Sequence, residues 1–215
     1  MDEIIIRLAR AIASHRRLRI LSCLAREGER APTTLATDLG MPLSSLSTCL
    51  RMLASVGLIR GRRSGANCYY AFTSPYAERT LSGAMRRWLE RLLREERNRH
   101  KNCGLLEVRN GPADDGQSSL HATIFDAATA FADLRRLQIL RHVEAHDGTT
   151  VEDLVKELRM SPYAVSRHTA KLRRRGLLCV QKKAAGRGSY GIVREYKSQV
   201  HRRMYQIVRA TWAKG

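Results

Sequence analysis

The sequence predicts a mainly α-helical fold with small β-hairpins, of the α+β class, arranged as two similar domains. Three observations support this prediction. Apolar residues recur at the 3.6-residue helical period through most of the 215 residues. Short strand-like runs interrupt these helical stretches. Finally, the sequence matches itself when it is shifted by 119 positions.

The internal match is clearest where residues 11–21 align with residues 130–140, because seven of the eleven aligned residues are identical. Most other identities are apolar residues at helical spacing, so the two halves are expected to share a fold. Glycine, proline and aspartate residues without apolar periodicity lie between the halves. We therefore expect one domain over residues 1–101, a linker over 102–119 and a second domain over 120–215.

Four helices are expected at the start of the first half. The apolar period predicts two helices that meet near Ser14. Pro32 suits the first turn of a third helix that ends at Gly40, and Pro42 precedes a fourth helix that ends at Gly57. Two helices joined by so short a turn are typical of a helix-turn-helix motif.

A hairpin and a last helix complete each half. Residues 58–61 and 68–72 are expected to form two short strands around a basic turn that contains glycine. A helix is then expected over about 76–97. The second half repeats this order and is expected to end in a helix over about 195–212.

The outer side of the fourth helix is the first candidate DNA-reading surface. At 100° per residue, Leu46, Leu50 and Leu53 form its buried side, and small polar residues with one cation face away from them. The candidate base contacts on this helix are Ser44, Ser45, Ser47, Thr48 and Arg51. Those on the equivalent helix of the second half are Tyr163, Ser166, Arg167, His168 and Lys171. Each position taken singly is explained equally well as a solvated helix residue, so the prediction depends on the hairpin that follows.

Each of these helices leads into a hairpin with cations at its turn. The candidate phosphate contacts are Arg62 and Arg63 in the first half, and Lys182, Lys183 and Arg187 in the second. The chain has 39 Lys and Arg against 20 Asp and Glu, a formal net charge of +19 that is spread evenly over both halves. A helix for base readout beside a basic hairpin for phosphate anchoring predicts double-stranded DNA as the partner.

At these positions the sequence resembles a known family. The run from Ser166 to His168, followed by Gly176, resembles the recognition-helix motif of the ArsR/SmtB winged helix-turn-helix repressors. Residues 130–140 resemble that family's junction between its first two helices. The first half carries Cys49 where the family commonly has histidine. The resemblance implies two winged helix-turn-helix domains in one chain and a role in transcriptional repression.

The resemblance also bears on assembly, because members of this family are usually homodimers joined through their first and last helices. Two copies in one chain imply that these surfaces pair within the chain as a pseudo-dimer, and a homodimer of whole chains is the alternative. Since the two reading helices differ, the expected operator has two unlike half-sites. The expected function is a sequence-specific, DNA-binding transcriptional repressor. A plasmid-type replication initiator and a non-specific architectural DNA-binding protein are the alternatives.

No metal ion or other cofactor is expected. The family's usual metal sites use cysteine in the third helix or an Asp, His and Glu set in the last helix. Residues 35–39 hold no cysteine, and residues 76–97 hold neither histidine nor cysteine. His142 and His146 could place two imidazoles on one helical face, but no third ligand lies at a readable spacing.

The five cysteines include no C-x-x-C pair, which indicates reduced thiols in a reducing compartment. Cys23 resembles in position one thiol of the family's persulfide-sensing branch, and Cys103 is its candidate partner in a thiol switch. The alternative, that Cys23 is a small buried apolar residue, is favoured. Cys49 has no visible cationic neighbour that would activate it.

Other classes of protein are disfavoured. No Walker-type glycine loop, H-E-x-x-H motif or G-x-S-x-G motif occurs, so no enzymatic activity is expected. The longest apolar run, residues 4–6, is far shorter than the roughly 18 residues of a membrane span, and Asp2 and Glu3 stand where a secretory signal carries positive charge. A cytoplasmic location at the bacterial nucleoid is therefore expected.

Overall fold

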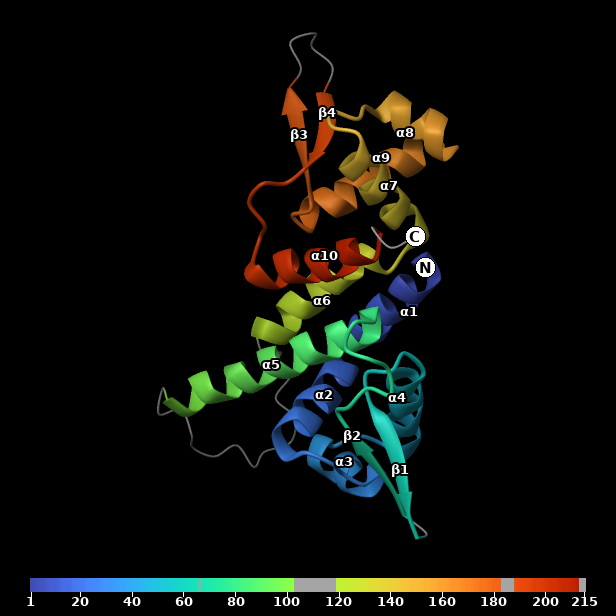
Figure 1. Cartoon of the computed structure of the whole chain (residues 1–215). Coiled ribbons are helices and arrows are strands. Elements are labelled where there is room, and N and C mark those ends of the chain that lie inside the picture. Colours follow the sequence, from blue (N-terminus) through green and yellow to red (C-terminus); the bar gives the residue numbers. More distant parts are fainter. Residues whose placement is uncertain (66, 103–118, 183–187, 213–215) are drawn as a thin grey trace. The chain divides into compact units, whose positions relative to one another are not determined.

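The described part of the chain is mainly helical, with two small antiparallel hairpins, which confirms the expected fold class. The computed structural model describes residues 1–65, 67–102, 119–182 and 188–212 (Figure 1). Most of the linker expected over 102–119 lies outside these residues. Among the described helices, none combines the length and the apolar character needed to cross a membrane.

The chain forms two compact units. The N-terminal unit consists of Ala11–Ala122, and the C-terminal unit consists of Thr123–Gly215 together with Met1–Arg10. The first ten residues therefore pack with the second half of the sequence. Within the C-terminal unit, Arg141 donates a hydrogen bond of 2.9 Å to Asp2, which helps to hold α1 (Asp2–Ile12) there.

The N-terminal unit contains the first expected helix-turn-helix. In chain order its elements are α2 (His15–Glu27), α3 (Pro32–Leu39), α4 (Leu43–Ser55), β1 (Arg60–Ser64), β2 (Asn67–Ala71) and α5 (Leu81–Asn102). Leu46, Leu50 and Leu53 of α4 are at most 1% exposed, which confirms the predicted buried side of this helix. α3 and α4 are the helix-turn-helix pair, and the β1–β2 hairpin follows directly (Figure 1).

The C-terminal unit repeats this order of elements. They are α6 (Ser119–Phe131), α7 (Leu134–Ala145), α8 (Val151–Leu158), α9 (Pro162–Arg174), β3 (Leu178–Lys182), β4 (Gly188–Ile192) and α10 (Gln199–Trp212). The first four residues of α6 belong to the N-terminal unit. The turn between α3 and α4 uses Gly40 at φ 58°, and the turn between α8 and α9 uses Arg159 at φ 48°. Both turns thus need a left-handed backbone, which the second obtains without glycine.

Three elements, α5, α10 and β1, begin a few residues later than the apolar pattern predicted. The residues before them cap a helix or belong to the core. Thr80 Oγ1 accepts a 3.1 Å hydrogen bond from the Gly83 N–H, so it caps α5 and starts that helix at residue 81. Ser198 caps α10 in the same way. β1 begins at residue 60 because Leu58 and Ile59, at most 1% exposed, belong to the core.

Two buried histidines, His121 of the N-terminal unit and His201 of the C-terminal unit, make close polar contacts. His121 Nε2 lies 2.7 Å from Ser22 Oγ, and His201 Nε2 lies 3.2 Å from a carboxylate oxygen of Asp126. Burial lowers the pKa of each imidazole from 6.5 to about 4, and nearby positive charges lower it further in the same direction. Both rings are therefore neutral in the folded protein at pH 7.

The free energy of unfolding is expected to fall by about 2–4 kcal/mol between pH 7 and pH 5. In that range the unfolded chain protonates both imidazoles, whereas the folded protein keeps them neutral, so acid favours unfolding. Above pH 7 neither state binds these protons and the contribution stays constant. Urea unfolding at each pH measures the effect. His121→Gln and His201→Gln should each remove a large part of the slope, whereas His146→Gln, at an exposed position, should leave it unchanged.

Candidate nucleic-acid interface

The first candidate reading helix, α4, exposes the side that the sequence predicted. Ser44, Thr48 and Arg51 are exposed, and Ser45 and Ser47 are partly buried. Thr48 Oγ1 donates to the Ser44 carbonyl oxygen at 3.1 Å, and Arg51 Nη2 donates to Thr48 Oγ1 at 3.4 Å. The polar groups along this face are thus connected to one another and to the helix backbone.

The second candidate reading helix, α9, begins with a side-chain cap and presents larger residues. Ser161 Oγ accepts a 3.2 Å hydrogen bond from the Ala164 N–H, and Pro162 occupies the first helical turn. Tyr163 is 77% exposed. Ser166 and Arg167 are also exposed, and Lys171 is partly buried.

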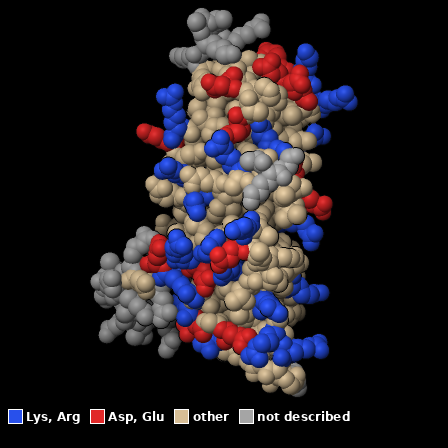
Figure 2. All heavy atoms as spheres, in the orientation of Figure 1, with Lys and Arg blue, Asp and Glu red and all other residues tan. Residues whose placement is uncertain are grey.

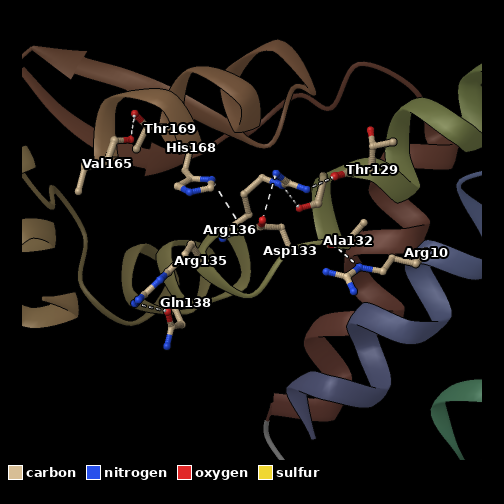
Figure 3. Close-up of polar contacts among 11 residues, drawn as sticks. Arg10, Thr129, Ala132, Asp133, Arg135, Arg136, Gln138, Val165, His168 and Thr169 are labelled. Carbon is tan, nitrogen blue, oxygen red and sulfur yellow. Dashed lines mark hydrogen bonds and ion pairs between the residues drawn. The ribbon is translucent and has the colours of Figure 1, made fainter. Parts of the chain in front are cut away.

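His168 departs from its expected place on the exposed side of α9. Its side chain is 6% exposed, and its Nδ1 lies 3.7 Å from a carboxylate oxygen of Asp133 (Figure 3). Asp133 also caps α7, because it accepts a 3.2 Å hydrogen bond from the Arg136 N–H. Burial lowers the pKa of His168 below its ordinary value. The ring therefore holds α9 against the start of α7 and does not lie on the surface that could meet DNA.

In each unit, an arginine donates hydrogen bonds to the backbone at the end of the helix that precedes it. Arg136 Nε donates to the Ala130 carbonyl oxygen at 3.0 Å, and its Nη2 donates to the Thr129 carbonyl oxygen at 2.8 Å (Figure 3). In the N-terminal unit, Arg17 Nε donates to the Ala11 carbonyl oxygen at 2.6 Å. Both the donors and these two alanine acceptors are 119 positions apart, so the same contact occurs in each unit.

The cysteines have different surroundings. The Arg17 guanidinium group lies beside Cys49, where sequence reasoning had found no cation. Burial lowers the pKa of Arg17, and the hydrogen bond with Cys49 opposes that shift. Cys23 is 2% exposed, and burial raises the pKa of its thiol, so it has the environment of a core residue. Cys103, its candidate partner, lies outside the described residues.

Both expected cations of the first hairpin, Arg62 and Arg63, lie at exposed positions of β1, but Arg62 forms an ion pair. Arg62 donates to both carboxylate oxygens of Glu29, at 3.0 and 2.6 Å, and its guanidinium carbon lies 5.6 Å from the centre of the Tyr69 ring. The hydrogen bond from Arg62 holds the pKa of Glu29 below its ordinary value. Arg63 is exposed beside this pair.

Backbone bonds fix both hairpins to the residues that precede each helix-turn-helix. Arg30 and Tyr70 exchange two hydrogen bonds of 2.9 and 2.8 Å, and the Tyr190 N–H donates to the Thr149 carbonyl oxygen at 2.7 Å. Thr169 Oγ1 of α9 also donates to the Tyr190 hydroxyl at 3.2 Å. In both units the hairpin is therefore tied to the start of the helix-turn-helix, and in the C-terminal unit the reading helix is bonded to the hairpin directly.

Of the three expected phosphate contacts in the second hairpin, only Lys182 lies within the described residues. Lys182 is the last residue of β3, whereas Lys183 and Arg187 lie outside the described residues. Elsewhere, Lys and Arg side chains are scattered over the visible face, with Asp and Glu side chains between them (Figure 2). The positive charge is thus distributed, as the even spread along the sequence predicted.

The described residues contain no group of three or more His, Cys, Asp and Glu side chains that could hold a metal ion. The rings of His142 and His146 stack with their centres 4.5 Å apart. Burial, followed by the nearby His146, lowers the pKa of His142. This histidine pair lacks the further ligand that a zinc site needs.

Each half of the chain matches a different protein family. Residues 133–187 match the MarR family, and residues 15–63 match the IclR helix-turn-helix domain. The first match covers α7 to β3, and the second covers α2 to β1, so each includes one helix-turn-helix and part of its hairpin.

One relative and two solved structures resemble parts of this chain. The HTH-type transcriptional regulator Rv0324 of Mycobacterium tuberculosis is 47% identical over 64 residues, which is 30% of this chain and 28% of that protein. A fragment of a possible transcriptional regulatory protein from Mycobacterium bovis is 34% identical, covering 45% of this chain and 92% of the fragment, with a TM-score of 0.35. The homodimeric winged helix-turn-helix DNA-binding domain of Mb0332, a possible ArsR-family regulator from the same organism, is 29% identical, covering 51% and 89%, with a TM-score of 0.35.

Proposed function

We propose that this DNA-binding helix-turn-helix transcriptional regulator is an ArsR-type repressor with two tandem winged helix-turn-helix domains. The proposal extends to its operator, which α4 and α9 read as two unlike half-sites. The observation that carries it is the contrast between these helices. They occupy equivalent places in two units with the same order of elements, yet α4 exposes Ser44 and Thr48 where α9 exposes Tyr163 and Arg167.

An intramolecular pseudo-dimer would bring the two unlike helices to one DNA duplex. This part of the proposal is supported by α1, because residues 1–10 pack in the unit that contains the second helix-turn-helix. Arg10 Nε donates to the Ala132 carbonyl oxygen at 3.0 Å within that unit (Figure 3). A chain that shares its first helix in this way needs no second copy to complete both units. Light scattering on the DNA complex tests this directly, since one chain per operator is the expected result and two chains would indicate a homodimer.

Replacing Arg167 with alanine is expected to relax base preference in one half-site, by about 1–3 kcal/mol at a guanine, because arginine can bond bidentately to that base. Thr48→Ala should relax preference in the other half-site only. Selection of bound duplexes from a randomised library, repeated with each variant, measures both effects. A palindromic site whose two halves respond equally to either substitution would mean that two identical helices read it.

The Glu29→Gln variant, which lacks the carboxylate that engages Arg62, is expected to bind random duplex severalfold more strongly. The slope of log affinity against log salt concentration should steepen by about one unit. The reason is that Glu29 competes with DNA phosphates for the same guanidinium group. Fluorescence anisotropy at several salt concentrations measures the change. Glu78→Gln makes the same change in net charge beside Arg87, away from the hairpin, and serves as the matched control. An equal gain in both variants would show that net charge alone is responsible.

Genome-wide mapping of bound DNA tests the repressor role. A small number of asymmetric sites that overlap promoters, with increased transcription when the protein is absent, is the expected result. Repeated sites at a replication origin would instead support a replication initiator. Uniform coverage without preferred sites would indicate an architectural protein.

A further inference from the structure

The exposed faces of α4 and α9 differ in charge at equivalent positions. Four pairs of residues, each 119 positions apart, occupy these faces: Ser44 and Tyr163, Thr48 and Arg167, Met52 and Lys171, Ser55 and Arg174. α9 thus carries three cations at places where α4 carries none. The one cation on the face of α4 is Arg51, whose counterpart is Ala170. α4 itself therefore gains less from attraction to phosphates than α9 does.

A large apolar side chain takes the place of one of the missing charges. Met52, which stands where α9 has Lys171, is 41% exposed. Met52 lies four residues after Thr48, so the two side chains are neighbours on one face of the helix. Leaving such side chains in water is unfavourable, and covering them with an apolar group would be favourable.

Two hydroxyl groups on this face are already used by the helix. Thr48 Oγ1 donates to the Ser44 carbonyl oxygen, and Ser55 Oγ donates to the Met52 carbonyl oxygen at 2.9 Å. The hydroxyl hydrogens of Thr48 and Ser55 are therefore committed to the backbone. The part of the face formed by Thr48 and Met52 is thus suited to apolar contact, whereas Ser44 and Arg51 remain as hydrogen-bond donors.

We propose that α4 selects thymine, with Met52 and the methyl group of Thr48 packing against thymine 5-methyl groups in the major groove. These methyl groups are the apolar feature that base pairs display there. The proposal rests on the proposed function, because it assumes that α4 reads one half-site. DNA is favoured over a protein partner because Arg51 lies on the same face and the cationic β1 strand follows in the same unit.

Replacing thymine with deoxyuridine tests this, because it removes the methyl group and keeps the base-pairing groups. A preferred duplex is first selected from a randomised library with the full chain, and the half-site whose preference changes in Thr48→Ala is assigned to α4. Deoxyuridine in that half-site is expected to weaken binding about fourfold for each contacted methyl group. The same replacement in the other half-site should change affinity less than about twofold, since α9 presents cations there.

Variants connect the effect to the named side chains. In Met52→Ser, the ratio of thymine to deoxyuridine affinity in the α4 half-site is expected to fall toward one. Met52→Lys, which installs the residue found at position 171, should lower that ratio and strengthen binding to random duplex. Leu134→Ser is the matched control, because Leu134 is 45% exposed on α7 and should leave the ratio unchanged.

Each other outcome is decisive. Specific binding with equal affinity for both bases overturns the thymine proposal and leaves the proposed function standing. Failure to select any preferred duplex overturns the proposed function itself. If Met52→Ser changes the oligomeric state and leaves the base ratio as in the wild type, this face of α4 contacts protein and the thymine proposal is wrong.

Discussion

DNA binding is expected to weaken by about 10³–10⁵-fold when the salt concentration rises from 50 to 200 mM, for roughly 6–10 phosphate contacts. The physical reason is that Lys and Arg release condensed counterions from the duplex when they meet phosphates, and salt opposes that release. The chain has the charge for this, at +19, with exposed arginines in both units. Those on or beside the reading elements are Arg51, Arg60, Arg62, Arg63, Arg167, Arg173 and Arg174.

Fluorescence anisotropy with a labelled duplex, measured over a series of salt concentrations, gives the slope of log affinity against log salt. Neutralising Arg62 and Arg63 together should make the slope shallower by at least about one, the contribution of Arg63, because Glu29 already engages Arg62. Binding to specific and random duplex should weaken alike. A nearly flat response to salt would contradict the assignment of the positive charge to nucleic-acid binding.

Asp126→Ala is expected to destabilise the C-terminal unit by about 3 kcal/mol, because it leaves several positive or hydrogen-bonding groups without their shared acceptor. Asp126 of α6 pairs with Arg175, the residue that follows α9, and with Lys197 Nζ at 3.0 Å and His201 Nε2 at 3.2 Å. The side chains of Asp126 and Arg175 are 18% and 19% exposed, so the expected loss lies at the lower end of the range for buried ion pairs.

Thermal and urea unfolding of the full chain measure this loss, which corresponds to a fall in Tm of about 6–12 °C. Asp126→Asn should recover part of the stability, since its amide oxygen still accepts hydrogen bonds. Asp147→Ala removes an exposed aspartate of the same unit and should change stability by less than about 0.5 kcal/mol. Equal stability of Asp126→Ala and Asp147→Ala would show that the Asp126 cluster contributes nothing to folding. A fall in DNA affinity larger than the loss of folded protein would indicate that Arg175 also positions α9.

The local pattern of the sequence was sufficient to predict the elements and the exposed side of α4. Leu46, Leu50 and Leu53 recur at the helical period, and Pro32 and Gly40 mark the limits of α3, where the structure begins and ends that helix. These features act through residues a few positions apart. The apolar pattern did not predict the cap at Thr80 or the other helix starts that lie later than expected, because it does not distinguish a capping side chain from a helical residue.

The sequence by itself determined a mainly helical chain with two hairpins, the buried side of α4 and the even distribution of basic residues, because periodicity, backbone preference and composition are local properties. The tertiary structure alone decided which polar groups meet. It buries His168 against Asp133, engages Arg62 with Glu29 and places residues 1–10 with the second half of the chain. These partners lie between 33 and more than 100 residues apart, so their pairing depends on the path of the whole folded chain, which no local pattern contains.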